Sequence, residues 1–348
     1  MQGKKADKKV DSTDVVKCKT CGADMYFDIA SGKLRCPYCD NTVEAKANVF
    51  ENEHNVDESK LRHEDGVITY QCPNCHAKCE MHGVFDTSAK CPFCGATNVL
   101  KVDDIPGLAP DAILPFKITR DVASQNALKW IKKKLYAPIK LKKSFKPENL
   151  NSVYSPTFSF DSDTFSTYNG RLGEYYTVTV GSGKDRRTET RTRYFNVSGT
   201  YSQFFNDVLI EVSPKLSQKE FEKVGGFDTD NAVEYTSEYI AGHSSERYDT
   251  SVNDAYGTAK EKMNARIKSA ILAQYHYDVV DYLHIDTSFN DSTFKYILVP
   301  LWCSGFKYRD KIYNYFVNGR TGKAGGKTPI SVWKVALTVV IIAAVIVG

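Results

Sequence analysis

The chain has 348 residues, of which 42% are hydrophobic, so it is long enough for one large domain or two to three small ones. Its 46 basic residues nearly balance its 42 acidic residues, and the net charge of +4 does not by itself indicate a nucleic-acid or anionic-membrane partner. The polar N-terminus MQGKKADKKVDSTD has no apolar segment, which argues against a secretory signal peptide and predicts a reducing cytosol around the thiols.

Cysteines are concentrated near the N-terminus, after a charged tail of residues 1–17 that is expected to be flexible. Nine of the ten cysteines precede residue 95, and eight of these form four Cys-x2-Cys pairs. The pairs make two repeats, C-x2-C-x14-C-x2-C from Cys18, Cys21, Cys36 and Cys39, and C-x2-C-x15-C-x2-C from Cys72, Cys75, Cys91 and Cys94. In a reducing compartment this spacing is typical of metal-binding knuckles.

Two knuckles can bring four thiolates to one ion at about 2.3 Å. The sequence therefore predicts two zinc ribbons, residues 18–44 and 67–101, each holding one structural Zn²⁺. Iron in a rubredoxin-like site is the alternative. Because four thiolates close the coordination sphere, no position remains for the water that a catalytic zinc activates.

The second repeat carries more soft ligands than one ion needs. Alignment from the first cysteines places Met25 opposite Cys79 and Gly22 opposite His76. The first ribbon completes its four ligands without these positions, so Cys79, His76 and His82 are predicted to lie outside the metal site. A ligand or redox role for Cys79 is the alternative.

A linker and a larger domain follow. Residues 45–66 are polar and acidic and are predicted to be a solvated linker that includes His54 and His63. From residue 102 onward Tyr, Thr and Ser become frequent and strand-like alternation appears. Residues 102–329 are predicted to form an α+β domain on an antiparallel sheet, because runs of strands are interrupted by few helices.

Periodicity predicts the main elements of this domain. Asp121–Tyr136 and Ser251–Gln274 carry apolar residues at helical spacing, and Ser251 and Asp254 form the spacing of a capping box. The stretch YSPTFSF places aromatic residues on one side of a strand, and EYYTVTV and TETRTRYFNV flank GSGKDRR as a long hairpin. YHYDVVDYLHI, TFKYILVPLWCSGFKY and KIYNYFVNG predict further strands.

The chain ends in an apolar segment, VALTVVIIAAVIVG, of 14 residues without a charge. As a helix it reaches about 21 Å, short of the roughly 30 Å hydrocarbon core, while 19 residues counted from Ile330 are barely sufficient. Residues 330–348 are predicted to be a transmembrane helix, with Lys323, Lys327 and Lys334 on a cytoplasmic side. A buried terminal strand or helix is the alternative, and a reading frame truncated at Gly348 would explain the abrupt end.

A basic stretch covers residues 120–146, where one arginine and eight lysines oppose Asp121 alone. Lys140 and Lys142 alternate with Ile139 and Leu141, so they are expected to share one face of a strand. A solvated surface is one interpretation, and a site for nucleic acid or acidic lipid headgroups is the other. The candidate anion-binding residues are Arg120, Lys129, Lys132, Lys133, Lys134, Lys140, Lys142 and Lys143.

Linear motifs of enzymes fail in detail. TGKAGGKT imitates a phosphate loop but has Thr321 where that motif needs glycine, and it is predicted to be the turn after Asn318 and Gly319. GHSSE at residue 242 lacks the second glycine of a nucleophile elbow, and no HExxH is present. Catalytic residues are therefore not predicted.

The four knuckles, together with YSPTFSFDSDTFSTYNG, EYIAGHSSERYD, VPLWCSGFKY and YFVNGRTGKAGG, resemble a bacterial family of TFIIB-type or double zinc-ribbon, membrane-associated proteins. The resemblance spans nearly the whole chain and implies ribbons first, an antiparallel α+β domain next and membrane segments at the C-terminus. Such proteins are sometimes named after the primosomal replication-restart helicase. Here the resemblance implies no helicase activity, because no nucleotide-binding motif accompanies the ribbons.

Three hypotheses of function follow. The first is a non-enzymatic adaptor anchored in the cell membrane by its C-terminus, with both ribbons in the cytoplasm and a protein partner. Its candidate contacts are Met25, Tyr26 and Phe27 in one ribbon and Val84 and Phe85 in the other, although such aromatics more often form a small core. The second is a membrane-tethered nucleic-acid-binding protein for replication or transcription. The third is an enzyme whose site lies in the α+β domain.

Overall fold

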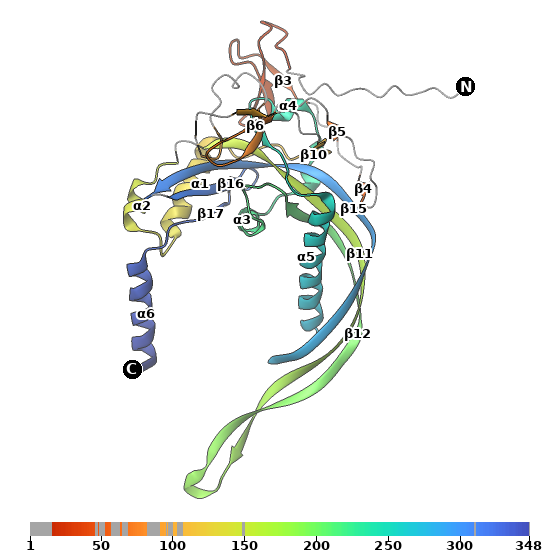
Figure 1. Ribbon diagram of the computed structural model, residues 1–348, viewed down its shortest axis with the longest axis vertical. Helices are drawn as coiled ribbons and strands as arrows, with labels where there is room; N and C mark the ends of the chain where they lie inside the picture. The colour runs from red at the N-terminus through yellow and green to blue at the C-terminus, as the bar shows by residue number, and fades with distance from the viewer. Residues whose placement is uncertain are drawn as a thin grey trace, which may run out of the picture.

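The computed structural model describes residues 16–45, 48, 53–56, 63–64, 69–81, 91–94, 96, 100–102, 107–147, 150–309 and 311–347. A long curved sheet forms the body of the molecule (Figure 1). The first ribbon lies at one end, while the C-terminal helix and the tip of the longest hairpin extend in the opposite direction.

The strands are β1 (Tyr26–Asp28), β2 (Lys33–Arg35), β3 (Thr42–Glu44), β4 (His54–Asn55), β5 (His63–Glu64), β6 (Thr69–Gln71), β7 (Lys78–Met81), β8 (Leu100–Val102), β9 (Gly107–Leu108), β10 (Ala112–Ile113), β11 (Asn151–Val180), β12 (Arg187–Glu211), β13 (Val233–Glu234), β14 (Ser244–Glu246), β15 (Val279–Tyr308), β16 (Lys311–Asn318) and β17 (Ala324–Gly326). The helices are α1 (Arg120–Lys133), α2 (Ile139–Ser144), α3 (Gln218–Val224), α4 (Ser237–Ile240), α5 (Val252–Leu272) and α6 (Val332–Val347), with short 3-10 turns η2 (Gly183–Asp185) and η3 (Thr229–Asn231).

Three long strands form the centre of the main sheet. β11 pairs antiparallel with β12 on one side and with β15 on the other. Because side chains alternate along a strand, the two faces carry different cores. Tyr154, Phe158 and Phe160 lie in one buried cluster, as the sequence predicts, whereas Val153 and Val299 lie in the other.

Helices cover both faces. α5 packs against β11 and β12 through buried Met263, Ile267 and Ile271, and its N-terminus is capped as predicted, since Ser251 Oγ accepts a hydrogen bond from Asp254 N at 3.1 Å. α3 packs against β17 and β12 and buries Phe221 in the second core. The α+β class with an antiparallel sheet is thus confirmed.

Two N-terminal segments join this sheet rather than standing apart. β4, inside the segment 45–66 that is predicted to be a linker, pairs with β15, and His54 Nε2 lies 2.7 Å from Asp111 Oδ1. The strands of the second ribbon, β6 to β8, enter the sheet through the pairing of β7 with β14. The first ribbon alone keeps its own three-stranded sheet among the described residues.

The lysine-rich segment after α1 is helical, so the predicted strand face is wrong. Residues 139–144 form α2 with Pro138 at the N-cap, and Leu141 is buried. Proline fixes the backbone angle that starts a helix, and positions two apart on a helix point about 200° apart. Lys140 is therefore exposed while Lys142 lies partly buried and donates a hydrogen bond to Lys132 O at 2.9 Å.

The C-terminal helix is shorter than predicted. α6 has 16 residues, because the chain enters helical conformation only at Val332. This length corresponds to about 24 Å, less than the hydrocarbon core. None of the helices in the described part of the chain is long and apolar enough to cross a membrane, so the prediction of a transmembrane helix at residues 330–348 is not supported.

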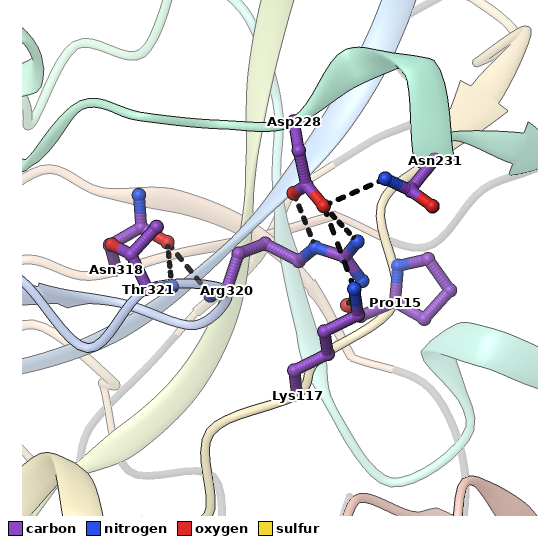
Figure 2. A network of polar contacts seen from close by, with 7 residues as sticks. All are labelled: Pro115, Lys117, Asp228, Asn231, Asn318, Arg320 and Thr321. Carbon is purple, nitrogen blue, oxygen red and sulfur yellow. Dashed lines mark hydrogen bonds and ion pairs between the residues drawn. The ribbon is translucent and has the colours of Figure 1, made fainter.

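The glycine-rich turn between β16 and β17 joins distant parts of the domain (Figure 2). Arg320 Nε donates to Asp228 Oδ1 at 2.7 Å, and its Nη1 donates to Pro115 O at 3.0 Å. Asn318 Oδ1 accepts from the backbone N–H groups of Arg320 and Thr321 at 2.7 and 3.0 Å. The turn is thereby fixed to the segment before η3 and to the approach to α1.

This turn also explains the apparent phosphate-loop sequence. A phosphate loop joins a strand to a helix, whose N-terminus binds the anion. Here the loop joins two antiparallel strands. Gly319 is required because a Cβ would lie 2.5 Å from the Phe116 ring, and Gly322 because its φ is +73°. The predicted strand turn after Asn318 and Gly319 is thus confirmed, and Gly319 and Gly322 serve packing and turn geometry.

Candidate metal centres

The first ribbon brings its four predicted cysteines together. The Sγ atoms of Cys21 and Cys36 lie 3.4 Å apart, and Cys39 Sγ lies 3.5 Å from Cys18 and 3.6 Å from Cys21. A tetrahedron with zinc–sulfur distances of about 2.3 Å has sulfur–sulfur edges of about 3.8 Å, whereas a disulfide is about 2.05 Å long. The arrangement therefore fits a tetrahedral ion and not a disulfide.

The second ribbon shows the same arrangement. Cys72 Sγ lies 3.6 Å from Cys94, and Cys75 Sγ lies 3.4 Å from Cys91. In both groups all four sulfur atoms lie within 4.8 Å of one another. Each four-cysteine group could therefore hold one metal ion. Four thiolates are the donor set of a structural zinc site.

A shared backbone turn forms the knuckles. The residue after the second cysteine donates its N–H to the carbonyl of the first, at 2.8 Å for Gly22, 3.1 Å for Asp40 and 2.7 Å for His76. Each of these residues has a positive φ, between 57° and 73°. His76 therefore occupies the position that glycine occupies in the first ribbon, where its backbone shapes the turn and its side chain is exposed.

Neighbouring thiols shift one another's pKa. The Cys91 thiol beside Cys75 lowers the pKa of Cys75 to about 5, and the same pair raises the pKa of Cys91 far above its ordinary value. Backbone N–H groups, first that of Cys21, lower the pKa of Cys18 to about 6. Each group thus stabilises at least one thiolate readily, but four thiolates at this spacing need a cation.

Two further cysteines lie near the second group but outside it. Cys79 is buried in β7, opposite Glu246 of β14, and burial raises its thiol pKa well above the ordinary value. Cys303 is buried in β15 with its Sγ 3.5 Å from Pro92 O. Both are kept as neutral thiols that pack in the second core. His82 lies outside the described residues.

The first ribbon docks on the domain through its hairpin. Phe27 N donates to Ala241 O at 3.0 Å, and the Phe27 ring lies 5.2 Å from that of Tyr239 and 6.4 Å from that of His243. Met25 and Phe27 are buried, so the core interpretation of these residues holds. Val84 and Phe85 lie outside the described residues.

The second ribbon is attached more extensively. Besides the pairing of β7 with β14, Asn151 Nδ2 donates to Pro92 O at 2.8 Å and Lys215 Nζ donates to Cys75 O. Gly305 allows close approach, since a Cβ there would lie 2.9 Å from Phe93 O. The metal group is consequently part of one edge of the main sheet.

A buried pair of carboxyl groups lies in the same region, and the sequence pattern did not indicate it. Ser213 bridges them: its N–H donates to Glu211 Oε1 at 2.9 Å and its hydroxyl to Glu246 Oε2. Burial raises the pKa of Glu246 to about 8, and burial and then the Glu246 charge raise that of Glu211. Burial therefore favours the protonated form of both groups. The pair could not be predicted from the sequence, because its two residues are 35 positions apart in the chain.

The candidate anion-binding residues lie on α1, on α2 and in the loop between them. Arg120, Lys129, Lys132, Lys133, Lys140 and Lys143 are exposed, whereas Lys134 and Lys142 are partly buried. Lys134 lies over the Trp130 ring at 5.4 Å from its centre. The lysines therefore share one region of the molecule.

Comparison with known proteins yields one extended similarity. No family model matches the chain, and no solved structure matches it. The chain is 28% identical over 327 residues to the uncharacterized protein YdjG of Bacillus subtilis (strain 168), which covers 92% of this chain and 91% of the relative. The similarity thus extends over nearly the full length of both proteins and brings no activity with it.

Proposed function

We propose that the protein is a non-enzymatic adaptor, in which the first zinc ribbon binds a protein partner and the C-terminal segment associates with the cytoplasmic face of the cell membrane. Two Zn²⁺ ions would stabilise the ribbons without taking part in chemistry, since closed thiolate sites have no open position. The single observation that supports the ribbon as a binding surface is Tyr38.

Tyr38 lies in the second knuckle of the first ribbon, between Cys36 and Cys39, and is 74% exposed. Cysteines on both sides of it would be fixed by one ion, so the backbone that carries the ring is already ordered before a partner binds. Exposed tyrosines on rigid turns are frequent binding hot spots, because they combine a large apolar ring with a hydroxyl. Because Met25 and Phe27 are buried, we propose the knuckle rather than these two hairpin residues as the contact.

The arrangement of the two ends supports an adaptor. The first ribbon lies at one end of the molecule, and α6 extends from the main domain in the opposite direction (Figure 1). A partner on the ribbon and a bilayer at α6 would not compete for the same surface.

Affinity capture from cells that express the tagged full chain tests the proposal. We compare the wild type with Tyr38→Ala and with Tyr175→Ala, a matched control at a tyrosine that is 54% exposed on the distant hairpin. A hot-spot residue contributes about 2 kcal/mol or more, so a specific partner should fall at least about 10-fold with Tyr38→Ala only. If Tyr38→Ala leaves the capture of every protein unchanged, or if Tyr175→Ala lowers it equally, the first ribbon is not the binding surface.

Nucleic-acid binding is the second candidate, and the exposed lysines of α1 and α2 favour it. Binding of duplex DNA by the full chain should then fall steeply with salt and be lost in the Lys132, Lys133 and Lys134→Glu variant. The adaptor proposal predicts no such salt-dependent binding.

A further inference from the structure

The apolar helix and the basic stretch, which are far apart in the sequence, meet in the structure. Ser331 N, just before α6, donates to Tyr136 O at 2.8 Å. Lys334 Nζ, in the first turn of α6, donates to Leu135 O at 3.0 Å and to Ala137 O at 2.8 Å. The loop between α1 and α2 therefore contacts the start of α6 and forms the base of that helix (Figure 1).

Large apolar side chains lie among the lysines at this base. Leu135 is 66% exposed, Ile139 is 61% exposed and Trp333 is 87% exposed. The surface that we call the root surface consists of these three residues and the exposed Lys133, Lys140 and Lys143. Tryptophan beside lysine is typical of the membrane interface, where the ring enters the headgroup layer and lysine stems cover apolar surface.

α6 itself exposes every face. Val339, Val340, Ile341 and Ile342 are consecutive and are 54–63% exposed. Consecutive positions are about 100° apart on a helix, so no single groove of a protein partner could cover all four. Acyl chains can surround a helix completely, and the apolar surface favours transfer from water by about 25 cal/mol per Å².

We propose that the root surface binds anionic phospholipid headgroups while α6 enters the apolar part of the same leaflet. This rests on the proposed membrane association and adds the lipid class and the residues. Lysine is recognised here as a cation at the surface of an anionic bilayer, and each lysine near such a surface contributes about 1 kcal/mol. The exposed leucine and isoleucine favour a bilayer over DNA, because phosphate contacts leave aliphatic side chains in water.

Flotation with vesicles tests the inference on the full, zinc-loaded chain. The vesicles contain phosphatidylcholine alone or with about 30% phosphatidylglycerol, a typical anionic fraction for such tests. The wild type should bind the anionic vesicles, and Lys133, Lys140 and Lys143→Gln should bind them roughly 100-fold more weakly. Lys19, Lys219 and Lys268→Gln removes the same charge from positions elsewhere on the molecule and should retain binding.

Tryptophan fluorescence gives a second measurement. Trp130 and Trp302 are buried, so a shift of emission to shorter wavelength on addition of anionic vesicles reports Trp333. The shift should be absent in Trp333→Phe. Unchanged melting of each variant shows that the exposed substitutions leave the fold intact.

The outcomes separate the proposals. Equal flotation with neutral and anionic vesicles, unaffected by the lysine changes, would overturn the role of the root surface and leave membrane association through α6. Failure to bind any vesicle would overturn both. Binding of duplex DNA that depends on the same three lysines, or concentration-dependent dimers that bury α6, would replace the bilayer with nucleic acid or a second copy as the occupant.

Discussion

Arg320 shows how one side chain can hold distant segments together. It lies in the turn after β16, is almost fully buried and donates to both oxygens of Asp228 and to Pro115 O. The guanidinium, chiefly through its hydrogen bonds, lowers the pKa of Asp228 to about 2. A planar fork that matches a carboxylate in two bonds is specific to arginine, so lysine would not replace it.

Arg320→Gln is expected to lower the free energy of unfolding by about 1–2 kcal/mol, because it removes the two guanidinium bonds to Asp228 and the donor to Pro115 O. Asp228 then keeps only the weaker contacts with Asn231 Nδ2 at 3.0 Å and Lys117 Nζ at 3.6 Å. Urea unfolding of the zinc-loaded protein measures the loss. Arg171→Gln is the control, since Arg171 forms an exposed pair with Asp281 at 3.6 Å and should change stability by less than about 0.5 kcal/mol. Equal small losses in both variants would show that the turn is held by its backbone alone.

Glu246 should make stability depend on pH. Its pKa is about 8 in the folded chain and 4.5 when unperturbed, so the native state keeps a proton that the unfolded state releases between these values. Stability therefore falls as pH rises through that window, by at most about 1.4 kcal/mol per pH unit. The groups that act on it besides burial are Ser213, which donates to it, Lys215, whose positive charge favours ionisation, and Cys75, whose charge opposes ionisation.

Glu246→Gln keeps the shape and removes the titration, so the loss of stability between about pH 6 and pH 8 should shrink by about 1–2 kcal/mol. Urea midpoints at both pH values measure it. Glu261→Gln, on the surface of α5, should leave the wild-type difference intact. An equal destabilisation at both pH values would mean that Glu246 is already ionised and needed as an acceptor.

Helices and strands with a clear hydrophobic periodicity could be predicted from the sequence. The apolar stripe of α5 and the alternation of Tyr154, Phe158 and Phe160 both hold. The short alternation of lysines around Leu141 could not distinguish a strand from a helix. The structure has a helix here, with Pro138 at its N-cap. The cysteine spacing likewise predicts the two groups, because each knuckle is a local turn.

The two ribbons should differ in what their metal stabilises. Cys36→Ser opens the first ribbon, which has its own sheet and is held to the domain mainly around Phe27. Cys91→Ser opens the second ribbon, whose β7 is paired within the main sheet. Metal analysis should give two zinc ions in the wild type and one in each variant. Melting should fall by roughly 5 °C or more with Cys91→Ser and by less than half of that with Cys36→Ser.

An equal fall in melting temperature for the two cysteine variants would mean that both ribbons contribute equally to the stability of the domain. Fewer than two zinc ions in the wild type would contradict the structural assignment of the metal groups themselves.

At the scale of the whole molecule, the sequence pattern could not show which segments meet. Nothing local tells that β4 and β7, far upstream, complete a sheet built on β15 and β14, because strand partners are chosen by tertiary packing. The meeting of Lys334 with the loop at Leu135 spans 199 positions, so two separate sequence features became one surface only in the structure. The length of the apolar C-terminal segment likewise did not show at which residue α6 begins.

The long hairpin gives a prediction about the whole molecule. Pairing of β11 with β15 ends at Gly173 and Val279, whereas pairing with β12 continues to Val180 and Arg187. Beyond Gly173 the hairpin is therefore a ribbon of two strands with no third strand and no core among the described residues, an arrangement that is marginally stable in water. Its amides should exchange with solvent far faster than those of residues 157–168, where three strands pair.

Replacing residues 177–190 by Asn-Gly, a two-residue turn that can join the opposed Tyr176 and Arg191, should change melting by less than about 2 °C. Phe160→Ala, in the three-stranded part and fully buried, should by contrast lower the free energy of unfolding by about 3–5 kcal/mol. Strong protection along the distal ribbon, or a large loss of stability on shortening it, would mean that its exposed tyrosines are covered in solution. Either result would make the distal ribbon a contact surface rather than a free end of the hairpin.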